Sequence, residues 1–554
     1  MKVTIEGLPF EMRQGQTIME AAEAIGLMGS GVKDRPIAAR IGGEIFNLAY
    51  TPLYEASVSL LRYGDEGGSR VYERTLQFVL IMCVRKLFAD ARVFVKYSLG
   101  DGLYMTIEKE PEFSPEDMLL LKEEMRSVIK RDLKLVRKRM SISDALSFFE
   151  KDGQLDKAAL LKWRRFSYFD VYRCPEYSEY IDYYYGETAP STGFVPVFDL
   201  HYLTGGLVMM RPDKADPEKA AEYVPSPKMA EVFRRSDSWG RLMTCSTANE
   251  LNTRVENGSV RELIRVNEAL HEKMFAKTAD AIIQRGAKAV MIAGPSSSGK
   301  TTSANRIATQ LRAEGLDPLM ISLDNYYCDR QFCPRDEDGE LDFEHIEALD
   351  IKRFNHDLKL LMAGEEVETP IFDFITQKPK EHGNVMRCGK DQLLIIEGIH
   401  GLNPRMLGED IDMDKVFRVY VSALTTINLD DHNRVRTTDL RLLRRLVRDH
   451  ETRGASMERT LSMWPSVRRG EAKWIFTYQE QADMILNTIL HYEPAIMKRH
   501  IYPLLLTVPK ESEYYYMARS IVKYLNYFLE ADVEDEIPPT SVLREFIGGN
   551  TFYI

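Results

Sequence analysis

Hydrophobic and polar residues alternate with a short period over the first 62 residues of the chain. The spacing at 17–25 predicts a short helix, and alternation predicts strands at 2–6, 9–12, 37–41, 45–48 and 57–61. A small sheet that holds one helix, of the β-grasp type, accounts for this order of elements.

The pattern changes after residue 62. Helical spacing at 76–88 and 115–134 places apolar residues on one face, and the extended segments that follow are rich in tyrosine and phenylalanine. These segments lie near 166–172, 178–185 and 194–211, and the proline-rich stretch 212–227 predicts a surface loop. We therefore predict an α+β domain over 63–235.

Residues 236–286 are interpreted as a polar linker followed by a connecting helix at 259–285. From residue 287 the order strand, glycine-rich turn, helix, strand is typical of a parallel α/β sheet, which we assign to 287–510. For the remaining residues, 511–554, we predict a C-terminal tail with one helix near 513–530. The predicted fold class is multi-domain, with α+β and α/β parts.

Composition narrows the class of protein. Of the 554 residues, 44% are hydrophobic and 28% charged, which is the balance of an ordinary soluble protein. The six cysteines form no CxxC pair, and no apolar run is long enough to span a membrane. We therefore expect a cytoplasmic protein without a membrane partner. The net charge of −11 excludes an overall basic nucleic-acid binder, so anion binding must come from a local patch.

The sequence GPSSSGKT at 294–301 fits the phosphate-binding pattern G-x-x-x-x-G-K-[ST]. It follows an apolar strand at 289–293 and precedes a predicted helix, as this loop requires. Glycines let the backbone N–H groups converge on one anion, while Lys300 reaches the terminal phosphates and Thr301 can hold Mg²⁺. Nucleotide contacts are predicted for Gly294, Ser296, Ser297, Ser298, Gly299, Lys300, Thr301 and Thr302.

Two carboxylates end the next apolar strands. Asp324 follows the strand at 319–323, where it could accept the proton of an acceptor hydroxyl, and Glu397 follows 393–396, where it could meet Mg²⁺. The predicted metal ligands are Thr301, Glu397 and Asp324. Alternatively, Asp324 caps a turn and Glu397 pairs with a lysine at the sheet edge.

An arginine-rich segment at 434–469 is the local patch. It holds ten arginines, no lysine and four acids, a net of 10 − 4 = +6. Arg441, Arg445 and Arg448 share one helical face, and Arg453 precedes Gly454, where the helix should end. Planar guanidinium groups suit phosphate oxygens, which predicts a lid over the phosphates; a solvated charged face is the alternative.

Six stretches of residues 287–490, in order, resemble the uridine kinase / phosphoribulokinase family, and most of all its uridine–cytidine kinase branch. They are GPSSSGKT, SLDNYY, DFEHIEALD, PIFDFITQKP, IIEGIHGL and DLRLLRRLVRDHETRG. The resemblance implies a P-loop fold and transfer of phosphate from ATP, with Mg²⁺, to the 5′-hydroxyl of a nucleoside such as uridine or cytidine.

The resemblance also assigns roles to residues. It implies catalytic roles for Asp324, Lys300, Arg448 and Arg453, and substrate contacts from Asp324, Tyr326, Glu344, Phe372, Gln377 and Arg445. Some positions depart from the family pattern. Phe372 stands where tyrosine is common and Gln377 where histidine is common, while Glu344 replaces aspartate and Ala455 a last lid arginine. These changes leave the specificity for a pyrimidine open.

The front of the chain resembles two other modules. Residues 1–62 resemble a TGS domain, and 70–235 resemble the second additional (editing) domain of threonyl-tRNA synthetases. The similar stretches are VLIMCVRKLF, DGLYMTIE, FSPEDMLLLKEEMRSVIKRDL and TGFVPVFDLHYLTGG. The editing site of those enzymes uses an HxxxH pair and a CxxxH pair. In this chain Arg74 and Phe78 stand at the first pair, and Tyr184 and Thr188 stand at the second.

We therefore expect a front half that binds or regulates, with RNA or a small molecule as partner, and does not hydrolyse. Tyr183, Tyr184 and Tyr185 line a residual pocket or form a packed sheet face. The leading hypothesis is a homo-oligomeric nucleoside kinase. The alternatives are a sugar-phosphate kinase, as in phosphoribulokinase, and an RNA- or ligand-sensing ATP-binding protein without turnover.

Overall fold

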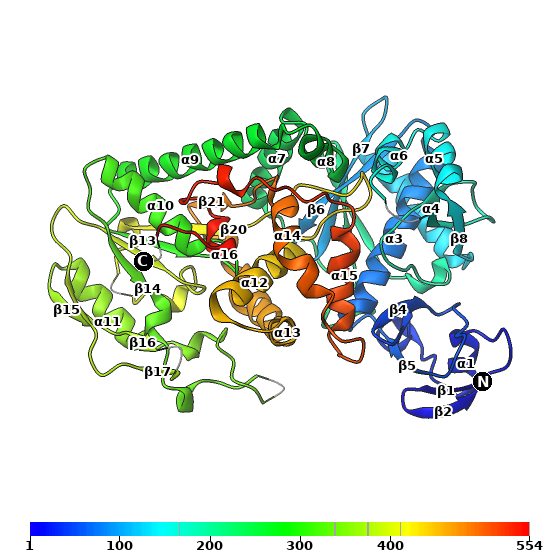
Figure 1. The fold of residues 1–554 in the computed structure, drawn as a ribbon, viewed down its shortest axis with the longest axis horizontal. Coiled ribbons are helices and arrows are strands. Elements are labelled where there is room, and N and C mark those ends of the chain that lie inside the picture. Colours follow the sequence, from blue (N-terminus) through cyan, green and yellow to red (C-terminus); the bar gives the residue numbers. More distant parts are fainter. Residues whose placement is uncertain (165–166, 337–338, 374–375, 410, 553–554) are drawn as a thin grey trace.

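The computed structural model describes residues 1–164, 167–336, 339–373, 376–409 and 411–552 (Figure 1). The N-terminal half lies at one end of the molecule and the strands that follow residue 287 at the other. Long helices run between the two ends. Among the described residues, no helix is long and apolar enough to cross a membrane.

The first unit is a five-stranded mixed sheet. Its strand order is β2-β1-β5-β3-β4, with β1 and β5 parallel and the other neighbours antiparallel. Thr17 caps the first helix by accepting from the Glu20 N–H, which fixes where that helix begins. The elements lie within two residues of the predicted ones: β1 (Lys2–Ile5), β2 (Leu8–Glu11), α1 (Ile18–Ala24), β3 (Ala38–Ile41), β4 (Glu44–Asn47) and β5 (Ala56–Leu61), with an additional α2 (Gly31–Asp34).

The second unit surrounds a long buried helix, α3 (Glu66–Leu87). One sheet has the order β11-β12-β7-β6 and a smaller one the order β10-β9-β8, all antiparallel. Apolar residues of this unit and of the first sheet form one continuous core. The other elements are β6 (Arg92–Leu99), β7 (Gly102–Glu108), α4 (Pro115–Lys130), β8 (Val136–Ser141), α5 (Ile142–Lys151), α6 (Leu155–Leu161), β9 (Tyr168–Arg173), β10 (Ile181–Asp182), β11 (Asp199–Leu203) and β12 (Gly206–Met210).

The connecting region is more helical than predicted. Its long helix, α9 (Val260–Arg285), confirms the prediction, but α7 (Pro227–Leu242) and α8 (Ala248–Glu256) occupy the segment interpreted as a polar linker. Proline is favourable in the first turn of a helix, so Pro227, at the end of the predicted surface loop, is the first residue of α7, and α7 begins within the predicted 63–235 domain.

The predicted parallel sheet is confirmed. Its order is β14-β19-β13-β20-β21, and every neighbouring pair is parallel. The strands are β13 (Ala289–Ala293), β14 (Leu319–Ser322), β19 (Leu394–Glu397), β20 (Val416–Ser422) and β21 (Met484–Asn487), and the helices are α10 (Lys300–Ala313), α11 (Ile351–Met362), α12 (Thr437–Arg453), α13 (Met457–Trp474) and α14 (Glu493–Leu505). Two short hairpins pair β15 (Glu366–Thr369) with β18 (Asn384–Arg387) and β16 (Phe372–Asp373) with β17 (Lys378–Pro379).

The C-terminal segment returns to the sheet that carries the phosphate-binding loop. Its helices are α15 (Tyr515–Leu525) and α16 (Arg544–Ile547). Val542, Leu543 and Phe546 are fully buried in the same core as α12 and α14. The segment is therefore part of this core and not a separate tail (Figure 1).

One face of α3 joins the N-terminal half to the segment that leads into α12. The Arg70 guanidinium donates to Asp439 at 2.8 Å, and the Gln77 amide donates to the carbonyl oxygen of His432 at 2.7 Å. Between them, Glu73 accepts from Arg436 at 2.8 Å and from Arg211 at 2.7 Å. The guanidinium groups hold the pKa of the buried Glu73 carboxyl well below its usual range, against the effect of burial.

Candidate active site

The phosphate-binding loop connects β13 to α10, and its conformation requires glycine at both ends. A Cβ atom on Gly294 would lie 2.0 Å from the carbonyl oxygen of Val421. Gly299 has a φ of +85°, and a Cβ there would lie 2.5 Å from Val542. Since both constraints exclude a side chain, the loop keeps the tight curl that lets N–H groups converge.

The loop has the groups that hold a nucleotide phosphate. The side-chain oxygens of Ser297 and Ser298 are buried without a hydrogen-bond partner in the part of the chain that the structure describes. The Lys300 ammonium lies over the loop and donates to the carbonyl oxygen of Pro295 at 3.3 Å. The first N–H groups of α10 have no partner within the helix and carry its positive dipole end. These residues therefore fit an anion.

Two arginines of α12 form hydrogen bonds with the phosphate-binding loop. Arg441 donates to the carbonyl oxygen of Ser296 at 3.0 Å, and Arg445 donates to the hydroxyl of Ser296 at 2.8 Å. Glu471 of α13 accepts from the Ser296 N–H at 2.9 Å and forms a two-pronged pair with Arg441. The loop is thus fastened by an ion pair that is itself buried.

This arrangement corrects the predicted arginine lid. Arg441 and Arg444 are fully buried, and Arg444 pairs with the buried Glu493 at 2.6 and 2.7 Å. A buried guanidinium needs a counter-charge, so these two arginines are not available to a phosphate. Only the end of the helix, which stops at Gly454 as predicted, leaves arginines beside the acceptor side of the loop.

Those arginines are Arg448 and Arg453, and they lie close enough to Asp324 to act on its charge. Burial raises the pKa of Asp324, while Lys300, Arg453 and Arg448 favour its ionised form. Arg448 also donates to Asp449 at 2.8 Å, which orients its guanidinium group. The predicted catalytic residues are therefore brought together at the carboxyl end of β14.

Glu397 lies at the end of the adjacent strand β19. Its carboxylate accepts from the hydroxyl of Ser322 at 2.8 Å, and burial together with the charge of Asp324 raises its pKa to about 7. No cluster of three or more His, Cys, Asp or Glu side chains suited to a metal is found among the described residues. Two carboxylates and the Thr301 hydroxyl fit Mg²⁺, which usually keeps water and phosphate oxygens as further ligands.

Two of the predicted substrate residues lie on the acceptor side, Glu344 near Asp324 and Phe372 against Tyr327. Glu344 packs against Gly470, since a Cβ added to Gly470 would lie 2.3 Å from the Cβ of Glu344. Burial, followed by the charge of Glu471, raises the pKa of Glu344 to about 7. Phe372 is buried against the ring of Tyr327, with ring centroids 5.6 Å apart. Gln377 has a φ of +56° and a buried, unpaired Oε1 among the described residues. The prediction for motif residues 374–375 lies outside the described residues.

Tyr326 is not brought into the site. Its ring packs edge-on against Phe354 at 5.2 Å, and its hydroxyl donates to Asp357 at 3.1 Å. The neighbouring Tyr327 lies on the side of Phe372 instead, where burial and then the charges of Asp324 and Glu344 raise its pKa. A short 3-10 turn rotates these adjacent side chains to opposite sides, which sequence spacing did not predict.

The structure also adds a residue that sequence reasoning missed. Glu545 of α16 accepts from the Thr302 hydroxyl at 2.7 Å and from the Thr302 N–H at 3.3 Å. Asn550 donates to the same hydroxyl at 3.3 Å. A carboxylate therefore occupies donors at the beginning of α10 that were predicted to face the nucleotide. No local signal near residue 545 could have indicated this, since the partners are 243 residues apart.

Comparison with known proteins agrees with this geometry. Residues 289–492 match the Phosphoribulokinase / Uridine kinase family. A uridine kinase of Staphylococcus epidermidis is 32% identical over 196 residues, which are 35% of this chain and 84% of that protein. The chain belongs to the phosphoribulokinase / uridine kinase family. A solved structure of a possible uridine kinase from Bacillus stearothermophilus is 25% identical and covers 27% of this chain and 78% of that chain, with a TM-score of 0.23.

The N-terminal region is similar to threonine–tRNA ligases. The enzyme of Acetivibrio thermocellus is 30% identical over 206 residues, which are 37% of this chain and 32% of the ligase. This chain thus spans about a third of the length of the ligases that it matches. The kinase family assignment rests on the C-terminal half alone.

The four positions that correspond to the editing residues lie near one another. Arg74 donates to the carbonyl oxygen of Glu187, and the rings of Phe78 and Tyr184 are 6.3 Å apart. The Tyr184 hydroxyl donates to Asp182 at 3.2 Å, and Thr188 is fully buried. The Thr188 hydroxyl is buried without a hydrogen-bond partner among the described residues, and arginine, phenylalanine, tyrosine and threonine do not make the ligand set of the editing site.

We expect Glu545→Gln to bind ATP about 3- to 10-fold more tightly than the unchanged protein. Its carboxylate accepts from the donors that a phosphate would use, and a neutral amide competes less with an anion. Titration calorimetry with ATP and Mg²⁺ measures the change, and Glu511→Gln, at an exposed position, is the control. Unchanged or weaker binding would show that Glu545 does not compete with the nucleotide.

Proposed function

We propose that this protein transfers the γ-phosphoryl group of ATP to the 5′-hydroxyl of a nucleoside, with uridine or cytidine as the expected acceptors. The observation that carries the proposal is the position of Asp324. Its half-buried carboxyl lies at the end of β14, next to the phosphate-binding loop and under the influence of Lys300, Arg448 and Arg453. Membership of the phosphoribulokinase / uridine kinase family supports a phosphotransferase with this loop.

Each residue has a role that its environment supports. Asp324 accepts the proton of the acceptor hydroxyl, and its raised pKa makes it a stronger base than an exposed aspartate. Lys300, Arg448 and Arg453 stabilise the negative charge that develops on the transferred group. Thr301 and Glu397 would hold Mg²⁺, which when bound neutralises charge on the phosphates.

A sugar-phosphate kinase is the second candidate, and it is favoured by the residues around Phe372. The ring of Phe372 can stack on a planar base but has no hydroxyl to read its edge, so recognition of a pyrimidine depends on Gln377. Arg445 lies near Glu344 and close to the loop, where a second phosphate could also interact with it.

We propose that the front half is a regulatory or binding module without hydrolytic activity. In this proposal residues 1–62 form a TGS-like β-grasp unit, 63–235 an editing-like unit and 236–286 a connector to the kinase at 287–510, with 511–554 completing its core. The replacement of the editing histidines and cysteine by Arg74, Phe78, Tyr184 and Thr188 supports it. Deacylation of mischarged tRNA by the full chain would contradict this assignment.

The function is tested by measuring ADP formation with MgATP and a panel of acceptors. Nucleosides are compared with phosphorylated sugars, and products are identified by mass. We expect a nucleoside 5′-monophosphate. Turnover with a sugar phosphate alone would favour the second candidate, and no turnover with any acceptor would favour an ATP-binding sensor.

We expect Asp324→Asn to lower kcat by at least about 100-fold while the affinity for ATP stays within about threefold. The amide cannot accept the proton but has the same size, and general-base catalysis contributes at least this much. Steady-state kinetics and calorimetry measure the two quantities. Retention of a near-wild-type kcat would remove Asp324 from the mechanism.

The KM for the nucleoside should rise as the pH falls below about 7. Burial raises the pKa of Glu344 to about 7, and its carboxylate form accepts hydrogen bonds from ribose hydroxyls more strongly than the protonated acid does. The KM is measured between pH 6 and 8 at saturating MgATP, so that titration of Glu397 does not enter. Glu344→Gln should abolish this dependence; an unaltered profile in that variant would assign it to another group.

A further inference from the structure

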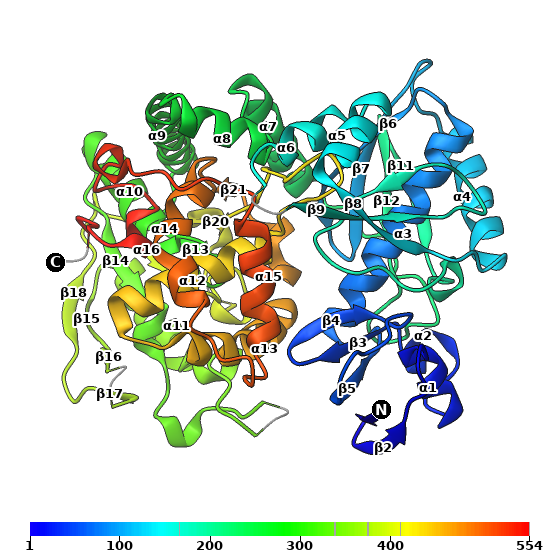
Figure 2. The ribbon, with the colours of Figure 1, turned by 45° about the vertical axis from the view of Figure 1, so that its right-hand side comes forward.

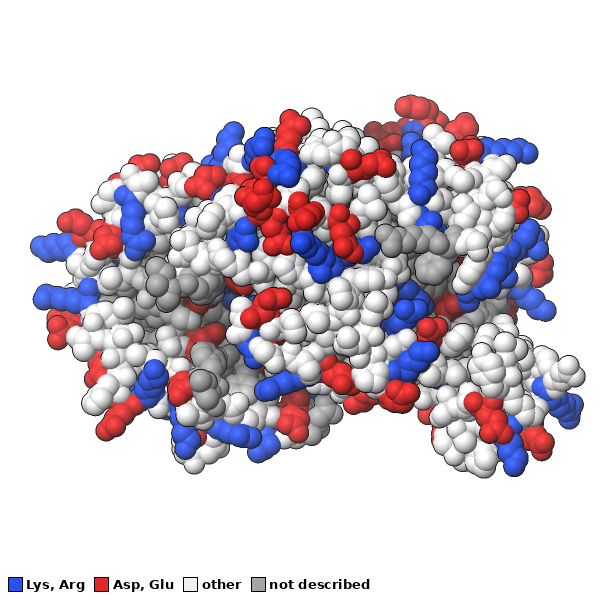
Figure 3. Space-filling model, viewed as in Figure 1, with Lys and Arg blue, Asp and Glu red and all other residues white. Residues whose placement is uncertain are grey.

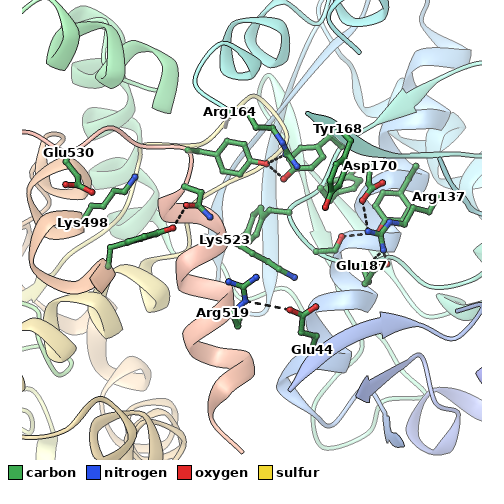
Figure 4. A pocket seen from close by; sticks show the side chains of 18 residues that line it. Glu44, Arg137, Arg164, Tyr168, Asp170, Glu187, Lys498, Arg519, Lys523 and Glu530 are labelled. Carbon is green, nitrogen blue, oxygen red and sulfur yellow. Dashed lines mark hydrogen bonds and ion pairs between the residues drawn. The ribbon is translucent and has the colours of Figure 1, made fainter. Parts of the chain in front are cut away.

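A second cavity, remote from the phosphate-binding loop, lies between the N-terminal half and the C-terminal helices. It has a volume of about 580 Å³. Figures 1 and 2 both place α15, one of its walls, between the helices that follow residue 437 and the N-terminal half. The opposite wall comes from β8, β9 and the segment that follows β10 (Figure 4). None of its lining residues belongs to the active site described above.

Tyrosine rings form much of this cavity. The seven tyrosines that line it are Tyr168, Tyr172, Tyr183, Tyr184, Tyr185, Tyr502 and Tyr527. Their hydroxyls are largely engaged by the protein: Tyr172 donates to Glu187 at 2.8 Å, and Tyr502 donates to Asn526 at 2.7 Å. The cavity therefore offers ring faces and edges, which suit a planar aromatic ligand.

The charges on the two walls are balanced differently. On the N-terminal wall, Arg137 is neutralised by Asp170 and Glu187, each at 2.7 Å. On α15, Arg519 has one acidic neighbour, Glu44, whose oxygen is 3.7 Å from its Nε. Figure 4 shows Arg519 and Lys523 on the same helix. This side of the cavity therefore has a surplus of positive charge.

Lys523 is the second cation of this wall. No hydrogen bond or ion pair of its ammonium group occurs among the residues that the structure describes, and burial lowers its pKa. The Arg519 Nε is likewise buried without a hydrogen-bond partner. Both groups are donors, so a ligand that pairs with them is an acceptor, and an anion pairs with them best.

We propose that this cavity binds a mononucleotide, with its base among the tyrosine rings and its phosphate on Lys523 and Arg519. The volume is in the range of small-molecule sites, and aromatic rings with a few well-placed donors are their usual lining. Base-to-ring stacking contributes about 1–3 kcal/mol per base in other proteins.

A mononucleotide fits better than an RNA chain. A site for a polynucleotide needs a basic track that follows the phosphates. On the face shown in Figure 3, lysine and arginine side chains are interspersed with acidic ones, and no continuous basic band crosses it. The pairing of Arg137 with two acids also removes one of the cations that such a track would need.

The test measures protection of Lys523 in the full-length protein. Lysines are acetylated with a soluble ester, with and without UMP or AMP, and the extent at each lysine is read by mass spectrometry. We expect one of the two nucleotides to reduce acetylation of Lys523 at least threefold, while the exposed Lys390 is unaffected. Because the readout is local, nucleotide bound at the kinase site does not contribute to it.

Equilibrium dialysis with the protecting nucleotide gives the second readout. The variant Asp324→Asn, Lys300→Met is used as the background, so that binding at the kinase site is weakened. In this background Lys523→Met should weaken binding of the nucleotide at least tenfold, and Lys390→Met should not. Equal labelling of Lys523 with and without both nucleotides would overturn the proposal. So would protection by a short single-stranded RNA alone. The proposal is independent of the kinase reaction, so inactivity toward all acceptors leaves it standing.

Discussion

The helix α12 carries two arginines that have no access to water, and this constraint organises the kinase half. A guanidinium group taken out of water must be paired and hydrogen-bonded, since an unpaired buried charge costs several kcal/mol. Arg441 and Arg444 meet the requirement with Glu471 and Glu493, which come from two later helices. Arg441 also donates to the carbonyl oxygen of Ser296 in the phosphate-binding loop, and Arg444 donates to that of Thr488, which follows β21. The loop, α12, α13 and α14 are therefore fixed together.

The N-terminal half is fastened to the same helix. Arg70, Glu73 and Gln77 lie three and four residues apart on one face of α3, and all three bond to residues between 432 and 439. A second buried cluster lies nearby, where Lys157 contacts Asp182 at 3.1 Å and His432 at 2.8 Å. The editing-like unit and the kinase thus share polar contacts that are as buried as those within each unit.

This arrangement explains which features could be predicted from the sequence. The strands of the first sheet, three strands of the parallel sheet (β13, β14 and β19), the phosphate-binding loop and the end of α12 at Gly454 depend on local spacing and local chemistry, whereas β20 and β21 were not predicted. The partners of the buried arginines do not: Glu471 is 30 residues from Arg441, and Glu493 is 49 residues from Arg444. A run of arginines therefore suggested a charged lid, although two of its members are in the core.

The same reason accounts for the remaining differences. Tyr326 and Tyr327 are adjacent and chemically identical, so only the geometry of the turn decides which one faces Asp324. The contact between Glu545 and Thr302, and the cavity formed by α15 with the tyrosines of the N-terminal half, join segments that are hundreds of residues apart. Such contacts are made by the tertiary fold, and no periodicity in one segment contains them.

The contacts of α3 with residues 432–439 and those of α12 with the phosphate-binding loop couple the stability of these two parts of the chain. Hydrogen exchange of the full-length Glu73→Gln variant tests this coupling, with Glu231→Gln, at a surface ion pair, as the control. Loss of the buried pairs should destabilise the junction by about 3–5 kcal/mol. We expect faster exchange in α12 and in residues 296–299 as well as at 432–436, and no change in the control. Faster exchange confined to 432–436, with an unaltered loop, would contradict it.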